Sequence, residues 1–328
     1  MSQKEESITI HNLYRHPDRK MSKLYFVRVW VWSLSAILVC AFPVFAQTPE
    51  SALGTPPKIS VSSPQKQSYD PQNVLQQLAM ADVVYLGETH DRADDHRAQF
   101  AIIQSLHRLN PNLAIAMEMF QRPYQSVLDR YLAGTITEAQ LKELTEYETR
   151  WGFPWEYYAP ILRFAKKNRL PVIALNTPTE ITRKVSRSGL ESLTLADRRF
   201  IPPLSEILAE PDAYRERMRL IYQEIHQGKG NSSQFDRFFL AQILWDETMA
   251  DRVSQFLRTN PTTNVVVLAG QGHIVYGDGI PNRVARRMPR TQRGALLQSL
   301  ILLNPPQEMT AKSDRPIADY FWNAQFSN

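Results

Sequence analysis

Several acidic and imidazole side chains stand directly after short apolar runs of the chain. The residues at these positions are Glu88, His90, Glu118 and His273. Glu88 and His90 lie two residues apart, so in an extended segment their side chains point to the same side. A glutamate beside histidines can act as a general base on water, and such a set can also hold Mn, Fe or Zn. All four are therefore candidate catalytic residues and candidate metal ligands.

The same residues also have a structural interpretation. A carboxylate that follows a buried strand is costly to bury unless it is paired. Glu88 and Glu118 could therefore be structural residues that form ion pairs and have no catalytic role. Two glycines precede His273 in Gly270-Gln271-Gly272-His273, which indicates a turn that presents the imidazole. On such a turn, replacing His273 with alanine is expected to cost under about 0.5 kcal/mol of stability.

The apolar runs alternate with helical patterns. Strands are expected at Val83–Leu86, Leu113–Met117, Pro171–Leu175, Val265–Ala269 and Ala295–Leu303. Helices are expected at Arg92–Leu109, Tyr124–Leu132, Glu138–Leu144, Tyr157–Asn168, Pro211–Gln227 and Phe235–Arg258. This alternation predicts an α/β fold, a single domain with a central, mostly parallel sheet flanked by helices. The stretch of about 178–263 predicts a helical insertion between the third and fourth main strands.

Parallel strands place their carboxyl ends at one edge of a sheet, where open α/β folds bind ligands. Glu88, His90, Glu118 and His273 each follow a strand, so we expect them to share one cleft. Several common catalytic motifs are missing, because the chain contains no GxSxG, HExxH or GxxxxGK[ST] pattern. The sequence therefore indicates a site built from carboxylates and imidazoles.

The N-terminal segment is typical of a targeting sequence. Basic residues precede the apolar stretch 29–45, and Val44-Phe45-Ala46 resembles a signal-peptidase site. We predict a Sec signal peptide over residues 1–46, with Met21 as an alternative start and an uncleaved anchor as the rival interpretation. The only cysteine, Cys40, lies in the apolar stretch, in a poor context for lipidation. Thiol and disulfide chemistry is therefore not expected after residue 46.

The next segment and the net charge add two expectations. Residues 47–72 contain five prolines and predict a flexible linker, followed by a folded domain over residues 73–328. Residues 1–46 hold six basic and three acidic side chains, and removing that +3 from the total of +5 leaves about +2. The basic composition therefore comes largely from the targeting segment, and no nucleic-acid partner is expected.

Five motifs occur in order along the chain: VYLGETHD from Val84, MEMF from Met117, WGFPWEYYAPI from Trp151, AQILWDETMA from Ala241 and GQGH from Gly270. Together they resemble the ChaN-like haem-binding uptake family, part of the broader Tiki and erythromycin-esterase-like superfamily. The likeness covers about residues 73–304. A segment from Asp319 to Trp322 is similar to the end of the family pattern.

The resemblance implies an exported, periplasmic or membrane-associated envelope protein that binds haem and serves haem or iron uptake. In the wider superfamily, glutamate and histidine at the matching strand ends look metal-binding or catalytic in hydrolases. The resemblance transfers that role to Glu88, His90, Glu118 and His273. It adds Asp246 as a supporting residue through the WDETMA motif, although a cap or an ion pair would explain Asp246 equally well.

Haem binding needs an aromatic pocket, an axial ligand and cations for the propionates. The candidate ligands are His90, Tyr157, Tyr158, His273 and Tyr276. The aromatic segment of residues 151–158 could form the pocket, or it could only pack in the core. A basic run after the fourth strand predicts a solvated helix face or propionate contacts, and it comprises Arg283, Arg286, Arg287, Arg290 and Arg293.

Two hypotheses therefore remain open at this level. The first is an exported haem-binding protein whose partners are haem, a second copy of the chain and a haem receptor or transporter. The second is a hydrolase that uses a divalent metal ion or a Glu/His pair to activate water.

Overall fold

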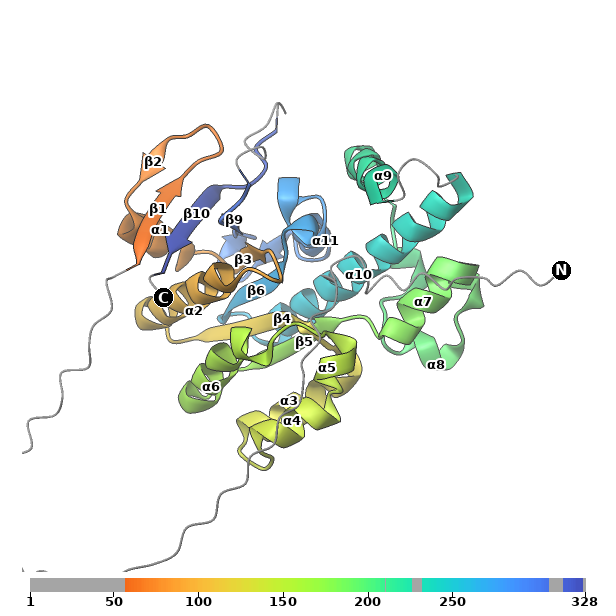
Figure 1. Ribbon diagram of the computed structural model, residues 1–328, viewed down its shortest axis with the longest axis horizontal. Coiled ribbons are helices and arrows are strands. Elements are labelled where there is room, and N and C mark those ends of the chain that lie inside the picture. Colours follow the sequence, from red (N-terminus) through yellow and green to blue (C-terminus); the bar gives the residue numbers. More distant parts are fainter. Residues whose placement is uncertain (1–56, 210, 226–231, 307–314, 327–328) are drawn as a thin grey trace, which may run out of the picture. The chain divides into compact units, whose positions relative to one another are not determined.

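The computed structural model describes residues 57–209, 211–225, 232–306 and 315–326 (Figure 1). Its centre is an eight-stranded sheet with the order β2-β1-β10-β9-β3-β6-β4-β5. The strands are β1 Lys58–Ser62, β2 Ser68–Tyr69, β3 Val83–Glu88, β4 Leu113–Gln121, β5 Val172–Asn176, β6 Asn264–Gly270, β9 Gln298–Leu303 and β10 Tyr320–Gln325. A separate antiparallel pair is formed by β7 Arg290–Thr291 and β8 Gly294–Ala295.

In this sheet the strands from β10 to β5 run parallel to one another, whereas β1 pairs antiparallel with both β10 and β2. Side chains alternate between two cores, as the pleat requires. Val84 and Leu86 of β3 face one core, whereas Val83 and Tyr85 face the other. Both faces are covered, which explains the uniformly apolar strands. The prediction of a mostly parallel α/β sheet is confirmed.

Helices cover both faces of the sheet (Figure 1). The first face is covered by α1 Pro71–Leu78, α2 Ala93–Leu109, α3 Gln125–Leu132, α4 Glu138–Leu144, α5 Tyr147–Arg150 and α6 Ala159–Asn168. The second face is covered by the long helix α10 Ser232–Thr259 and by α11 Ile280–Arg287. Each helix buries an apolar stripe against the strands, as Ile102 and Leu106 of α2 do.

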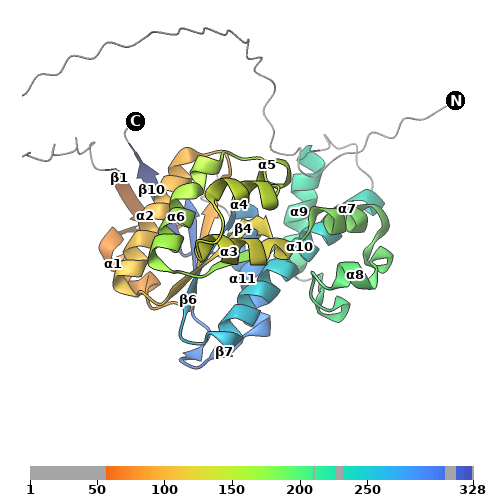
Figure 2. The ribbon, with the colours of Figure 1, turned by 90° about the horizontal axis from the view of Figure 1, so that it is seen from below.

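The predicted helical insertion between the third and fourth main strands is confirmed. It comprises α7 Thr179–Ser188, α8 Leu195–Arg198, α9 Asp212–Ile225 and α10, with short 3₁₀ turns between them. Figures 1 and 2 show α7, α8, α9 and the first part of α10 gathered at one end of the molecule. This lobe has its own apolar clusters, one around Tyr214 and Phe239 and another around Val185 and Leu244.

The prediction of a linker over 47–72 is wrong for residues 57–72. Strand β1 pairs with β10, so Ile59 lies opposite Ala324 and Val61 opposite Trp322. Asp70 then caps α1 by accepting from the backbone N–H groups of Gln72 and Asn73. These elements are short and the partner strand of β1 lies more than 250 residues away, so local periodicity does not reveal them.

Two further outcomes concern strand β9 and the N-terminal segment. β9 begins at Gln298 rather than Ala295, because residues 294–295 pair with β7 instead. The predicted signal peptide and residues 47–56 lie outside the described residues. Within the part that is described, no helix is both long enough and apolar enough to span a bilayer.

Candidate functional site

Glu88 ends β3 with its carboxylate fully engaged. Its Oε1 lies 2.7 Å from Nδ1 of His90 and accepts from the Tyr158 hydroxyl at 2.7 Å. Its Oε2 accepts from Nε2 of Gln99 at 2.6 Å. Gln99 and His96 come from the first turns of α2, which follows β3 directly. The buried charge is therefore offset by hydrogen bonds from three side chains, as a buried carboxylate requires.

His90 lies between this carboxylate and the end of β6. Register pairs Glu88 with Gly270, and a Cβ at Gly270 would come within 2.9 Å of Nε2 of His90. Only glycine therefore leaves room for the imidazole at this position. On its other side the ring contacts Trp151 and Phe153, with centroids 4.8 and 5.1 Å away.

A second histidine lies between two carboxylates. Nδ1 of His273 is 2.6 Å from Oδ1 of Asp246, and Nε2 is 3.5 Å from Oε1 of Glu118. Glu118 also accepts from the backbone N–H of Gly270 at 2.8 Å. Asp246 lies on α10 and accepts from the Tyr214 hydroxyl at 2.5 Å. Residues from β4, β6 and the inserted helices thus meet around one imidazole.

The two histidines and their carboxylates perturb one another. Burial alone would lower the pKa of His273, but the charges of Glu118 and Asp246 raise it to about 10. Burial alone would raise the pKa of Glu118, but the charge and hydrogen bond of His273 lower it to about 2. His90 and Glu88 follow the same pattern: the pKa of His90 is raised and that of Glu88 lowered, each against the effect of burial. At neutral pH His273 is therefore a cation that lies between the carboxylates of Glu118 and Asp246.

The structure brings together the four predicted site residues, and Asp246 joins them through His273. The assignment of Glu88, His90, Glu118 and His273 as ligands of a divalent metal stays a prediction. Among the described residues, no group of three or more histidine, cysteine or acidic side chains is placed to hold a metal ion. The carboxylates of Glu88 and Glu118 instead accept hydrogen bonds from Gln99 and Tyr158 and from the backbone N–H of Gly270.

The three candidate tyrosines differ sharply in environment. Tyr158 is fully buried, donates to Glu88, and burial raises its pKa well above 10, so the structure does not support it as a haem ligand. Tyr157 is half-buried and stacks on His96, with ring centroids 4.5 Å apart. Tyr276 is half-buried in the loop after His273, and its backbone has a φ of 59°.

Much of the aromatic segment packs in the core. Trp151, Trp155 and Tyr158 belong to the buried cluster on the first face of the sheet, whereas Phe153 and Tyr157 are partly exposed. The packing interpretation of this segment is therefore correct for its buried members. The indole of Trp155 also donates to Glu138 at 2.7 Å, which ties the segment to α4.

The basic run is solvated only in part, since Arg286, Arg290 and Arg293 are exposed. Arg283 is fully buried, and it forms an ion pair with Glu247 of α10 at 3.2 Å. Arg286 and Arg287 contact the same carboxylate at 2.8 and 2.6 Å. Arg293 instead pairs with Asp82. The prediction of a solvated face is wrong for Arg283 and Arg287, because the partner carboxylate comes from a helix that is distant in sequence.

Sequence reasoning did not include four side chains that complete the site, namely His96, Gln99, Tyr214 and Gln242. His96 and Gln99 lie three residues apart on the buried face of α2, beside apolar neighbours that make them resemble core positions. Gln242 precedes Asp246 by four residues, and its amide lies 3.1 Å from Nδ1 of His273. That helical spacing is the signal that could have linked Gln242 to the site.

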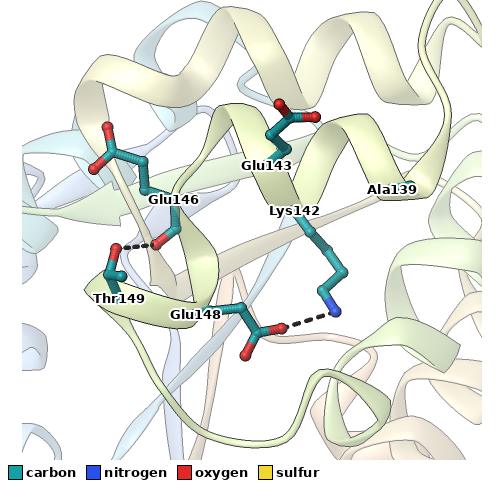
Figure 3. Close-up of a pocket in the computed structure, with 6 residues that line it drawn as sticks. All are labelled: Ala139, Lys142, Glu143, Glu146, Glu148 and Thr149. Atoms are coloured by element: carbon teal, nitrogen blue, oxygen red, sulfur yellow. Dashed lines mark hydrogen bonds and ion pairs between the residues drawn. The ribbon is translucent and has the colours of Figure 1, made fainter.

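A surface hollow lies on α4 and α5, lined by Ala139, Lys142, Glu143, Glu146, Glu148 and Thr149 (Figure 3). The one cation among these lining residues, Lys142, pairs with Glu148 at 2.8 Å. None of the lining residues belongs to the Glu88–His273 cluster. This acidic hollow is therefore not the predicted site.

The chain is similar to several known proteins. A family model described as "Haem-binding uptake, Tiki superfamily, ChaN" matches residues 74–284. The structure titled "Cofacial heme binding to ChaN of Campylobacter jejuni" superimposes with a TM-score of 0.63 at 17% identity, over 81% of this chain and 97% of that one. A mutant of the erythromycin esterase EreC, in its open conformation, is similar at a TM-score of only 0.43 and 14% identity, over 82% of this chain and 83% of that one.

A curated relative is Protein RETICULATA-RELATED 5, chloroplastic, of Arabidopsis thaliana. It is 27% identical over 269 residues, which cover 77% of this chain. The match spans only 35% of the length of the plant protein.

Proposed function

The chain belongs to the haem-binding uptake family ChaN of the Tiki superfamily, and we propose that it is an exported envelope protein that binds haem through Tyr276. Its role would be haem or iron uptake. Family membership supports haem as the ligand, and the loop after His273 supports the position.

The observation that carries the proposal is the conformation of Tyr276. A tyrosine with a φ of 59° is an outlier, and such strain persists where the surrounding structure imposes it. Here His273, three residues earlier, fixes one side of the loop, because its imidazole is held between the carboxylates of Asp246 and Glu118. The backbone N–H of Tyr276 donates to Ile317 at 2.8 Å, which fixes the other side of the loop.

The surroundings of Tyr276 suit a haem. The guanidinium of Arg217 lies 4.4 Å from the ring centroid, where it would stabilise a phenolate ligand. Arg315 donates to the carbonyl of Tyr276 at 2.7 Å and pairs with Asp278 at 3.0 Å, which holds a second guanidinium beside this loop. A Cβ built on exposed Gly272 meets no atom within 4 Å, so the outer side of this loop is open. Bound haem would supply a ferric iron that accepts the phenolate oxygen.

The ionisation of the site weighs against the hydrolase alternative. A general base must be unprotonated and is most effective when its pKa lies near the working pH. A pKa of about 10 keeps His273 protonated at neutral pH, and a pKa of about 2 makes Glu118 a weak base. The cluster therefore acts better as an anchor for the loop than as an activator of water.

Titration of the full chain with ferric haem, followed by the Soret band, tests the ligand. Tyr276→Phe should weaken haem binding by at least about tenfold, because it removes the iron ligand while keeping the ring. Tyr157→Phe is the matched control, because Tyr157 is also half-buried, and it should bind haem like the wild type. Equal affinity in Tyr276→Phe, with loss in Tyr157→Phe, would overturn the assignment.

Export is the second part of the proposal. It rests on the basic, apolar and small-residue pattern of residues 1–46. The intact mass of protein recovered from the envelope fraction should correspond to a chain that begins at Gln47. A full-length chain found only in the cytoplasm would refute export without affecting the haem assignment.

A further inference from the structure

A hollow of about 320 Å³ lies where the last turns of α10 and α11 meet the 3₁₀ turn Leu204–Glu206. It is lined by Glu206, Asp251, Arg258, Arg286 and Arg287. None of these residues belongs to the Glu88–His273 cluster or to the loop of Tyr276. The hollow is therefore a separate feature of the second face of the sheet.

Arg287, one of the residues that line the hollow, has a hydrogen-bond donor without an acceptor among the described residues. The Arg287 side chain is 6% exposed, and its Nη1 and Nε contact Glu247 at 2.6 Å and Glu206 at 3.3 Å. Its Nη2 has no hydrogen-bond partner in the part of the chain that the structure describes. A buried guanidinium N–H without an acceptor keeps the full cost of its lost hydration, so an acceptor is expected at this position.

The carboxylates nearby are already engaged. Asp251 accepts from Arg122 at 3.0 Å and from Gln255 at 2.8 Å. Glu247 is surrounded by the guanidinium groups of the basic run. Around the hollow, five arginines face three carboxylates, which leaves two positive charges uncompensated; the residues are Arg122, Arg258, Arg283, Arg286, Arg287, Glu206, Glu247 and Asp251.

We propose that this hollow binds a small dianion, a phosphate group, through Arg258 and Arg287. The planar guanidinium presents paired N–H donors that match phosphate oxygens. Arg287 offers a buried, preorganised donor, whereas Arg258 is exposed at the end of α10 and lines the same hollow. Nη1 of Arg258 lies 4.0 Å from Sδ of Met288, so no carboxylate contact has to break there.

Calorimetric titration of the full chain with inorganic phosphate, at constant ionic strength, tests the site. Saturable binding with one anion per chain is expected. Arg258→Gln should weaken it by about tenfold, because it removes a charge-assisted contact. Arg290→Gln removes an exposed arginine of the same basic run that does not line the hollow, so it should bind phosphate like the wild type.

Further measurements distinguish free phosphate from phosphomonoesters as the ligand, and loss of binding from loss of stability. Tighter binding of glycerol phosphate than of phosphate would assign the site to phosphomonoesters, and equal or weaker binding would assign it to free phosphate. Melting temperatures measured without phosphate should be equal in the two variants. Absence of saturable binding, or equal weakening in both variants, would overturn the proposal. None of these readouts involves haem.

Discussion

Replacing His273 with alanine is expected to destabilise the protein by about 3–5 kcal/mol, the typical cost of breaking a buried ion pair. The side chain of His273 is only 11% exposed, and it is the cation between Glu118 and Asp246. Its removal leaves both carboxylates without that charge. The loss of stability expected from the structure is thus much larger than the loss expected from the sequence, where His273 is assigned to an exposed turn. Denaturant unfolding at neutral pH measures the loss.

The pH dependence identifies charge as the cause. Because the folded-state pKa of His273, about 10, lies above its ordinary value of 6.5, its contribution is complete below pH 6.5. That contribution is lost as pH rises from 6.5 to 10, so the difference between wild type and His273→Ala should shrink over this range. His107→Ala on α2, where the imidazole packs edge-on against the Phe164 ring at 5.3 Å, serves as the control. A difference independent of pH would mean that packing, rather than charge, is lost.

Replacing Glu247 with glutamine is expected to cost a similar amount, about 3–5 kcal/mol. Glu247 is fully buried, and its carboxylate contacts Arg283, Arg286 and Arg287. A neutral amide would leave these guanidinium groups without their counter-charge, two of them almost entirely buried. The ion pairs also join α10 to α11, so the loss should lower the melting temperature by several degrees.

Glu143→Gln is the matched control, because Glu143 is exposed on α4 and its replacement changes the same charge. It should leave the melting temperature within about 1–2 °C of the wild type. A Glu247→Gln variant as stable as this control would show that the arginines find other acceptors. Both measurements belong in phosphate-free buffer, since an anion in the neighbouring hollow would offset part of the lost charge.

The central sheet was predictable because strands that are buried on both faces appear in the sequence as short, uniformly apolar runs. The run Val83–Leu86 is apolar throughout, and strand ends such as Glu88 and Glu118 then stand out as polar interruptions. Their convergence followed from topology alone, since parallel strands end at one edge. β1 has no such apolar run, because only one of its five residues is buried and the strand is defined by its pairing with β10 and β2.

The partners of the site were less predictable, because they depend on contacts between distant elements. Tyr214 reaches Asp246 from an inserted helix, and Glu247 reaches the basic run from another. Residue types alone do not show which arginine meets which carboxylate. The difference between Tyr158 and Tyr276 likewise depends on burial, since both follow aromatic or apolar residues in the sequence.

Vibrational spectroscopy of the ferric haem complex is the most direct test of the central claim. Resonance Raman spectra of the wild type should contain phenolate modes of a tyrosine bound to iron. These modes should disappear in Tyr276→Phe and persist in Tyr157→Phe, which retains the ligand and the Arg217 guanidinium above it. Phenolate modes that survive in Tyr276→Phe would contradict the account.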